Sequence, residues 1–222
     1  MNIILTGATG MVGEGALHEC ILSPLVEKIT IISRKPTGVV HPKVEELHLS
    51  DFLNPGQALD GLSGFNACFF CLGVSSVGMK KEDYERTTHD LTLAFAKALL
   101  PRNRELSFLY VSGAGTDSSE KGRIHWARVK GKTENDLTKV GFKAAYGLRP
   151  GYMHPTPGLK NVPSWGKYFT WMYPFFRAVF PNRFMTLGEM GRGMIMVAKN
   201  GSLKPILEAP DIIAMAMTHP RS

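Results

Sequence analysis

Residues 6–13 of the chain read TGATGMVG, and this stretch decides the fold that the sequence predicts. Its three glycines follow a short apolar run over 2–6 and precede apolar residues at helical spacing over 11–22. A glycine-rich turn between a strand and a helix is the context in which such a turn binds the diphosphate of a dinucleotide. The alternative is a turn that binds nothing. We expect diphosphate binding, by Gly7, Thr9, Gly10, Met11, Val12 and Gly13.

Beyond this turn, strand-like runs alternate with helical segments. Strands are predicted at 28–33, 44–49, 67–72, 106–112 and 144–149, and helices at 11–22, 81–100, about 124–140 and 186–199. The run ACFFCL over 67–72 is almost wholly apolar, which is typical of a parallel strand buried on both faces. The alternation predicts an α/β fold with a doubly wound parallel sheet, a single domain over residues 1–222. The proline-rich stretch 150–163 is expected to form a loop over the sheet.

Length and composition are those of one globular domain. The 222 residues are 44% hydrophobic and 20% charged, which excludes a disordered, collagen-like or coiled-coil chain. Three cysteines are too few, and odd in number, for a secreted disulfide framework. The opening MNIILTG has neither the basic nor the long apolar segment of a secretory signal. These features predict a cytoplasmic location.

Positive charge is concentrated in one part of the chain. The formal net charge is +7, and residues 137–188 contain seven lysines and arginines but no acidic residue. The basic residues are spaced out and form no recognition helix or zinc module, so no nucleic-acid partner is expected. A small anion or a membrane surface is the expected partner of this excess charge.

The end of the second predicted strand indicates which dinucleotide is bound. About 20 residues beyond the last glycine of such a turn, a carboxylate would hold a free ribose 2′-hydroxyl, whereas arginine favours a 2′-phosphate. Ser33, Arg34 and Lys35 stand there, without an acidic residue. Arg34 offers a planar fork to a phosphate and Lys35 a point charge. NADP is therefore predicted over NAD, the alternative being an ordinary solvated basic turn.

Further motifs carry a family resemblance. They are ISRKP (32–36), FFCLG (69–73), YVSGAGTDS (110–118), WARVKGKTE (126–134), GLRPG (147–151) and TLGEMGRGMI (186–195). With TGATGMVG, they make the chain resemble the atypical branch of the short-chain dehydrogenase/reductase superfamily over nearly its whole length. It is most similar to the Tat-interacting protein family of oxidoreductase-like proteins. The resemblance implies that Asp51 and Phe52 border the adenine, Leu72 and Gly73 lie along the cofactor, Ser112 is the active-site serine, Lys130 holds the nicotinamide ribose and Pro150 flanks the nicotinamide.

One departure from that pattern bears on catalysis. The superfamily has a tyrosine four positions before the lysine, and here Trp126 stands there. An indole N–H only donates, whereas a phenol can exchange a proton. Proton transfer would then fall to Ser112, His125, Tyr152 or water. Two functions follow: an NADP(H)-dependent reductase, with Ser112 polarising a carbonyl and Lys130 positioning the ribose, or a nicotinamide-nucleotide-binding sensor or scaffold without turnover.

An aromatic and basic region is expected at about residues 150–186. Nine aromatic residues lie between 165 and 184, where Lys167, Arg177 and two prolines exclude a transmembrane helix. Three interpretations remain open: a lid over an apolar substrate pocket, a hydrophobic cover on the sheet, or a peripheral membrane contact. The substrate is accordingly expected to be a small apolar or anionic molecule. No metal site is predicted, since Cys68 and Cys71 are assigned to the core.

Overall fold

A seven-stranded parallel sheet forms the centre of the computed structural model, which describes residues 1–161, 173 and 184–220. Its strands are β1 (Asn2–Thr6), β2 (Lys28–Ser33), β3 (Val44–His48), β4 (Ala67–Phe70), β5 (Ser107–Val111), β6 (Ala144–Arg149) and β9 (Ile206–Glu208). They lie in the order β3-β2-β1-β4-β5-β6-β9, and every neighbouring pair is parallel. The predicted doubly wound α/β fold is confirmed.

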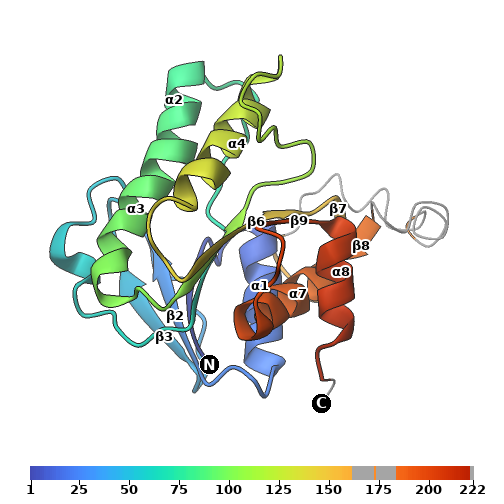
Figure 1. The fold of residues 1–222 in the computed structure, drawn as a ribbon. Helices are drawn as coiled ribbons and strands as arrows, with labels where there is room; N and C mark the ends of the chain where they lie inside the picture. Colours follow the sequence, from blue (N-terminus) through green and yellow to red (C-terminus); the bar gives the residue numbers. More distant parts are fainter. Residues whose placement is uncertain (162–172, 174–183, 221–222) are drawn as a thin grey trace.

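Helices cover both faces of the sheet (Figure 1). They are α1 (Met11–Leu22), α2 (Lys81–Glu85), α3 (Leu91–Leu99), α4 (His125–Leu137), α7 (Leu187–Asn200) and α8 (Ala209–Met217), with short 3-10 turns η1 (Gly56–Leu59) and η3 (Leu100–Arg102). Strand β1 shows why two layers form, because Ile3 and Leu5 join the core under α1, α7 and α8, whereas Ile4 joins the core under α3. Successive side chains of a strand point to opposite faces, so an apolar strand supplies both cores.

The strand order creates a switch point between β1 and β4. From β1 the chain proceeds outward through β2 to β3, then returns to place β4 on the other side of β1, where Ile4 pairs with Thr30 of β2 and Cys68 of β4. In open α/β sheets, ligands bind in the crevice outside the carboxyl ends of the strands at such a point. The TGATGMVG turn lies at this crevice, since it directly follows β1.

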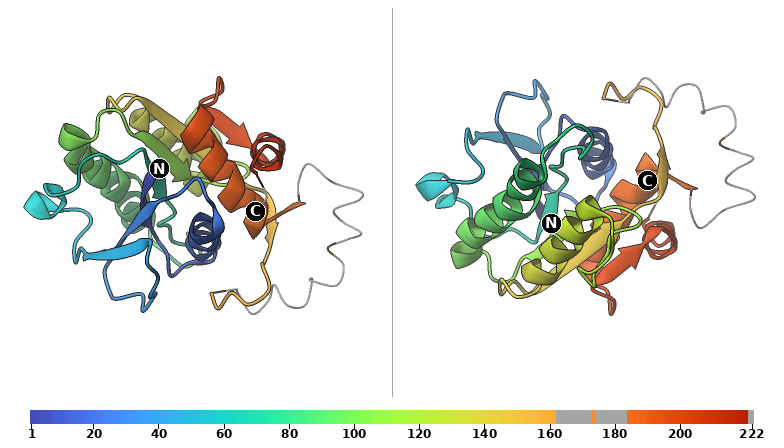
Figure 2. Two further views of the ribbon diagram at one scale, coloured as in Figure 1. Left: turned by 90° about the horizontal axis from the view of Figure 1, so that it is seen from below. Right: turned by 90° about the horizontal axis from the view of Figure 1, so that it is seen from above.

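Local details differ from the sequence prediction. The helix predicted over 81–100 is interrupted by a π-helical turn, η2 (Arg86–Asp90). The segment predicted as a loop contains strand β7 (Tyr152–His154), which pairs in parallel with β8 (Phe184–Thr186). Figure 2 shows this pair beyond α7 and α8, on the side away from α2 and α3. Strand β9 and helix α8 were not predicted. Helix α7, predicted over 186–199, begins with a capping box formed by Thr186 and Glu189.

Much of the aromatic and basic region lies outside the described residues. Residues 162–172 and 174–183, with Lys167, Arg177 and Arg183, are in that part, so the three interpretations of the region stay predictions. Across the described ranges, no helix combines the length and apolar character needed to cross a membrane.

Candidate dinucleotide-binding site

The glycine turn joins β1 to α1 through two close backbone approaches. Gly7 has a φ of +71°, a left-handed conformation that favours glycine, and its carbonyl accepts a 2.9 Å hydrogen bond from the N–H of Gly10. A Cβ on Gly13 would lie 2.0 Å from the Gly7 carbonyl oxygen, and one on Gly7 would lie 2.6 Å from the Cys71 oxygen. Both positions therefore require glycine, which holds the first turn of α1 against the ends of β1 and β4.

The start of α1 offers backbone donors to an anion. Gly10 is the N-cap residue and, within the described chain, no side chain caps this helix end. The first helical hydrogen bond is donated by the N–H of Glu14 to Gly10, so the N–H groups of Met11, Val12 and Gly13 precede the helical ladder. The partial positive charge of a helix N-terminus adds to these donors. This arrangement fits a diphosphate.

Beside the turn lies a cavity of about 550 Å³. It is lined by Gly7, Ala8, Thr9, Ile32, Ser33, Arg34, Lys35, Pro36, Phe52 and Leu72. These residues come from the carboxyl ends of β1, β2 and β4 and from the loop after β3. The structure thus brings together the predicted diphosphate turn, the two predicted phosphate-binding cations and two residues expected along the cofactor.

Arg34 and Lys35 present their charges at the rim of this cavity. Both residues are exposed, and among the described residues neither has a carboxylate partner. Their backbone is fixed, because the Ser33 hydroxyl donates to the Lys35 carbonyl at 2.7 Å and the ring of His48 binds the Arg34 carbonyl. A fixed backbone with two unpaired cations suits an anionic group of a ligand in the cavity.

Asp51 and Phe52, both expected beside the adenine, have different environments. Phe52 is 2% exposed and stacks on Phe95 with ring centroids 5.5 Å apart, so it closes the cavity as part of the core. Asp51 is exposed and binds its own loop, where the Asn54 side chain and then the Leu53 N–H lower the pKa of its carboxyl group. It does not line the cavity, and the adenine role assigned to Asp51 has no support in this geometry.

The second half of the predicted site is centred on a buried glutamate. Glu134, whose side chain is 1% exposed, accepts a 2.5 Å hydrogen bond from the Ser112 hydroxyl and a 2.5 Å bond from Nη2 of Arg149. Nε of Arg149 adds a third bond at 3.1 Å. A Cβ on Gly147 would lie 2.6 Å from Oε1 of Glu134, so glycine there makes room for the carboxylate. Glu134 therefore connects α4 to the ends of β5 and β6.

This network occupies the side chain of Ser112. Ser112 is 2% exposed, and its single hydroxyl proton is donated within the pair with Glu134. The proton is thus not available to polarise a substrate carbonyl, and the expected catalytic role of Ser112 does not fit the structure. Glu134 was missed from the sequence, where its position four residues after Lys130, on the same helical face, was the available signal.

Lys130 and Trp126 lie next to the loop that follows β5. Nζ of Lys130 donates to the backbone carbonyl of Ser112. Burial lowers the pKa of Lys130, and the charge of Glu134 acts against that shift. A Cβ on Gly115 would lie 3.5 Å from the Trp126 ring. The indole thus packs beside the loop, while the Lys130 ammonium lies at the end of β5.

Two further residues implied by the resemblance border this half. The Pro150 carbonyl accepts a 3.0 Å hydrogen bond from the N–H of Ala114, which joins the end of β6 to the loop after β5. Gly73 directly follows Leu72, and apart from its chain neighbours no heavy atom of the described residues lies within 4 Å of a Cβ built on it. The path beyond Leu72 is therefore open at that point.

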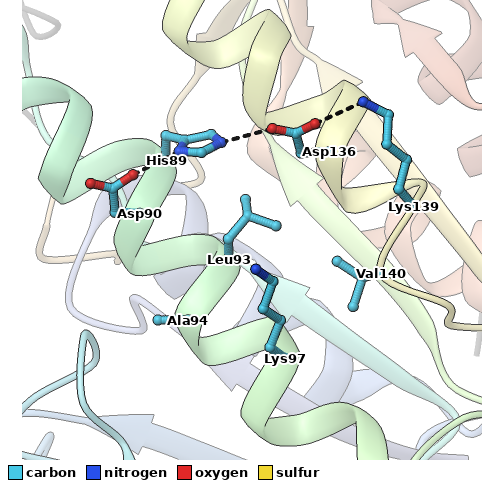
Figure 3. A pocket seen from close by; sticks show the side chains of 8 residues that line it. All are labelled: His89, Asp90, Leu93, Ala94, Lys97, Asp136, Lys139 and Val140. Carbon is cyan, nitrogen blue, oxygen red and sulfur yellow. Dashed lines mark hydrogen bonds and ion pairs between the residues drawn. The ribbon is translucent and has the colours of Figure 1, made fainter.

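A second cavity, of about 520 Å³, lies between α3 and α4 (Figure 3). Its charged side chains are largely paired, because His89 contacts Asp90 at 2.8 Å and Asp136 at 3.0 Å, and Lys139 contacts Asp136 at 2.9 Å. Lys97 extends toward the same space. The carboxylates of this cavity are already paired, so its charged groups attract a ligand less strongly than the unpaired Arg34 and Lys35 do in the cavity beside the glycine turn.

The cysteines behave as core residues. Cys68 and Cys71 are free, and they pack in the core, as predicted, on opposite sides of the sheet. Burial raises the pKa of the Cys71 thiol to about 12 and also raises that of Cys68. In the part of the chain that the structure describes, no three His, Cys, Asp or Glu side chains gather as metal ligands.

Comparison by sequence finds fungal relatives, whereas no protein-family model matches the chain. The chain is 34% identical over 143 residues to leucinostatins biosynthesis cluster protein T of Purpureocillium lilacinum, covering 63% of this chain and 52% of that protein. It is 29% identical over 156 residues to protein fmp52, mitochondrial, of Emericella nidulans, covering 68% and 66%. With protein FMP52, mitochondrial, of Candida albicans it shares 26% over 97% of this chain and 98% of that protein. The match thus spans about half to two thirds of the first two relatives.

These relatives correct the predicted location and leave the predicted family resemblance as it was. The cytoplasmic location predicted from the cysteines and the first residues is wrong on this comparison, because the Fmp52 relatives are named as mitochondrial proteins. The resemblance to the Tat-interacting protein family stays a prediction.

Solved structures share the fold at low sequence identity. MoeE5 in complex with UDP-glucose and NAD superposes with a TM-score of 0.67 at 14% identity, covering 97% of this chain and 81% of that one. The Bordetella bronchiseptica enzyme WbmF in complex with NAD+ gives 0.62 at 14% identity, covering 96% and 76%. The chain therefore shares the Rossmann-like α/β fold of these two NAD-containing structures.

Proposed function

We propose that the chain is an NADP(H)-binding protein of the short-chain dehydrogenase/reductase kind that reduces the carbonyl group of a small molecule. The observation that carries this proposal is the cavity in which the glycine turn, Arg34 and Lys35 meet. The turn would hold the diphosphate, and the two cations a 2′-phosphate. Two structural neighbours contain NAD, which supports a nicotinamide dinucleotide as the ligand class.

Different residues of the chain would bind the two ends of the dinucleotide. Arg34 and Lys35 lie at the end of β2, so the adenosine half would lie on that side of the turn. Lys130 and Pro150, at the ends of β5 and β6, would border the nicotinamide half. When bound, the nicotinamide supplies hydride transfer, so the protein has to bind, orient and provide a proton. We extend this proposal to residues 1–222 as one domain.

A second candidate function is a nicotinamide-nucleotide-binding sensor or scaffold without turnover. Two positions expected to transfer the proton favour this function. Trp126 stands where the family has a tyrosine, and the hydroxyl of Ser112 donates its proton to Glu134. NADPH oxidation measured against aldehydes, ketones and quinones separates the two. Turnover supports the reductase, whereas tight NADPH binding without turnover, with activity restored in Trp126→Tyr, supports the sensor.

The test of cofactor choice is the ratio of NADPH to NADH affinity. A charge-assisted hydrogen bond is worth about 1.5–3 kcal/mol, so Arg34→Ala should weaken NADPH binding about 10- to 150-fold and NADH binding much less. Arg104→Ala is the matched control, since Arg104 is an exposed arginine before the amino end of β5, whereas Arg34 follows the carboxyl end of β2. Equal losses for both dinucleotides in Arg34→Ala would refute the assignment of a 2′-phosphate site.

A further inference from the structure

Two side chains of β7 end in buried polar atoms without a partner. In the described part of the chain, neither the Tyr152 hydroxyl nor Nδ1 of His154 has a hydrogen-bond partner, although both atoms are shielded from solvent. The two residues are separated by one position in a strand, so their side chains share one face. Met153, between them, packs on the core from the other face. Buried polar groups are nearly always paired, so two orphans on one face call for an explanation.

Aromatic rings surround both groups. The Tyr152 ring lies 5.3 Å from that of Phe184 and 6.5 Å from that of Tyr173, measured between centroids. The His154 ring stacks on Tyr173 at 4.1 Å and 20°. Burial lowers the pKa of His154, so the imidazole is neutral at neutral pH. Aromatic side chains with a few convergent polar atoms are the usual lining of a small-molecule site.

The chain on either side of β7 contacts both halves of the candidate site. Before β7, the carbonyl of Pro150 accepts the N–H of Ala114, in the loop that also borders Lys130 and Trp126. After β7, the carboxylate of Glu14, in the first turn of α1, accepts the N–H groups of Lys160 at 2.9 Å and Asn161 at 2.7 Å. Strand β7 therefore belongs to a segment that runs from the end of β6 back to the glycine turn.

We propose that Tyr152 and His154 bind the oxygen of an aromatic ketone or aldehyde, and of the corresponding alcohol, whose ring lies on the aromatic side chains around them. This inference rests on the proposed function, because it names the substrate class of that reaction. A carbonyl oxygen accepts a hydrogen bond from the Tyr152 hydroxyl. An alcohol oxygen accepts the same bond, and its own proton is accepted by a nitrogen of the neutral His154 ring. The carbonyl form would thus satisfy the Tyr152 hydroxyl, and an alcohol that donates its proton to Nδ1 of His154 would satisfy both orphan atoms.

The orphan atoms also predict an effect on stability in the absence of substrate. A buried hydroxyl without a partner loses its hydrogen bonds to water on folding, so its removal should not destabilise the free protein. Tyr152→Phe is therefore expected to leave Tm unchanged or to raise it. Removing a hydroxyl that is hydrogen-bonded within the fold would instead lower Tm. Tyr110→Phe is the matched control, because Tyr110 is a buried tyrosine in the core on the other face of the sheet and bonds Thr133.

The binding experiment uses two probes that differ in one oxygen. We would measure Kd for acetophenone and for ethylbenzene by saturation-transfer NMR, with the full chain and no dinucleotide. One net hydrogen bond corresponds to a preference of about five- to tenfold for acetophenone in the wild type. Tyr152→Phe should abolish this preference while ethylbenzene binding persists, and His154→Phe should reduce it. Tyr110→Phe should keep it.

Several outcomes would overturn the inference. These are a wild type that binds neither probe or both equally, a preference that survives in Tyr152→Phe, and a Tm lowered by Tyr152→Phe as much as by Tyr110→Phe. NADPH titration of the same proteins keeps the two proposals apart. A preference for acetophenone without NADPH binding contradicts the proposed function alone, and NADPH binding without the preference contradicts this inference alone.

Discussion

Glu134→Gln should destabilise the protein strongly, although it changes only one atom of the side chain. The substitution removes the negative charge that three hydrogen bonds now satisfy, two from the Arg149 guanidinium and one from Ser112. The Arg149 side chain is 11% exposed and the Glu134 side chain 1%, so water cannot replace the lost charge. Burial lowers the pKa of Arg149, but its hydrogen bonds and charge interactions with Glu134 and Glu208 together outweigh burial, and the net shift is upward. A guanidinium is not deprotonated in proteins, so the arginine stays charged in the variant as well.

The magnitude follows from breaking a buried ion pair by removing one partner. Such a change costs about 3–5 kcal/mol, because the remaining charge is buried without compensation. For a domain of this size, each kcal/mol lowers Tm by about 2–4 °C, so a fall of about 6–20 °C is expected. The second partner of Arg149, Glu208 at 3.3 Å, is half exposed and compensates only in part. The assay is thermal unfolding followed by circular dichroism, with urea unfolding as a second measure.

An exposed ion pair provides the control. Glu45 pairs with Lys28 at 2.8 Å, with side chains 65% and 43% exposed, so Glu45→Gln should cost less than about 1 kcal/mol. If Glu134→Gln destabilised the protein no more than Glu45→Gln does, the account of Glu134 as the link between α4, β5 and β6 would be refuted.

Two further predictions concern the glycine turn and the second cavity. Gly13→Ala would place a Cβ 2.0 Å from the Gly7 carbonyl oxygen, so NADPH binding should weaken at least tenfold and Tm should fall. The control Gly61→Ala, at a position with open space around it, should change neither. Isothermal titration and thermal unfolding check this, and unchanged NADPH binding in Gly13→Ala would contradict the role of the turn. Lys139, followed by His89, lowers the pKa of the Asp136 carboxyl group below its ordinary value of 3.8. The stabilisation that Asp136 contributes is therefore present above about pH 4 and is lost as the pH falls through the folded-state pKa. Urea midpoints between pH 6 and 3 should therefore fall more for the wild type than for Asp136→Asn, and parallel curves would argue against it.

The elements that sequence predicted correctly carry their signals locally. The glycine turn is an example, since Gly13 is needed for a close contact with the carbonyl of Gly7, six residues earlier in the chain. The apolar run over 67–72 is another, because a strand buried on both faces needs no alternation. Strand β9 was missed for the opposite reason. It has three residues, and its pairing with β6 joins Gly147 to Ile206, far apart in the chain.

The candidate site likewise contains residues that the local sequence predicts and residues whose roles depend on distant contacts. Arg34 and Lys35 could be predicted because they follow β2 directly, and strand ends in a parallel sheet meet at one edge. The role of Ser112 could not, because the direction of its hydroxyl depends on Glu134, 22 residues later in the chain. The place of Glu134 on the same helical face as Lys130 was the available signal, but its burial becomes evident only when Arg149 is placed beside it.

The most direct test of the account is a calorimetric titration of the wild-type chain with NADPH. Saturable binding of one NADPH per chain in the micromolar range, lost in Gly13→Ala, is the predicted result. Heats that show no saturation up to about 1 mM NADPH would contradict the claim that this turn holds a dinucleotide.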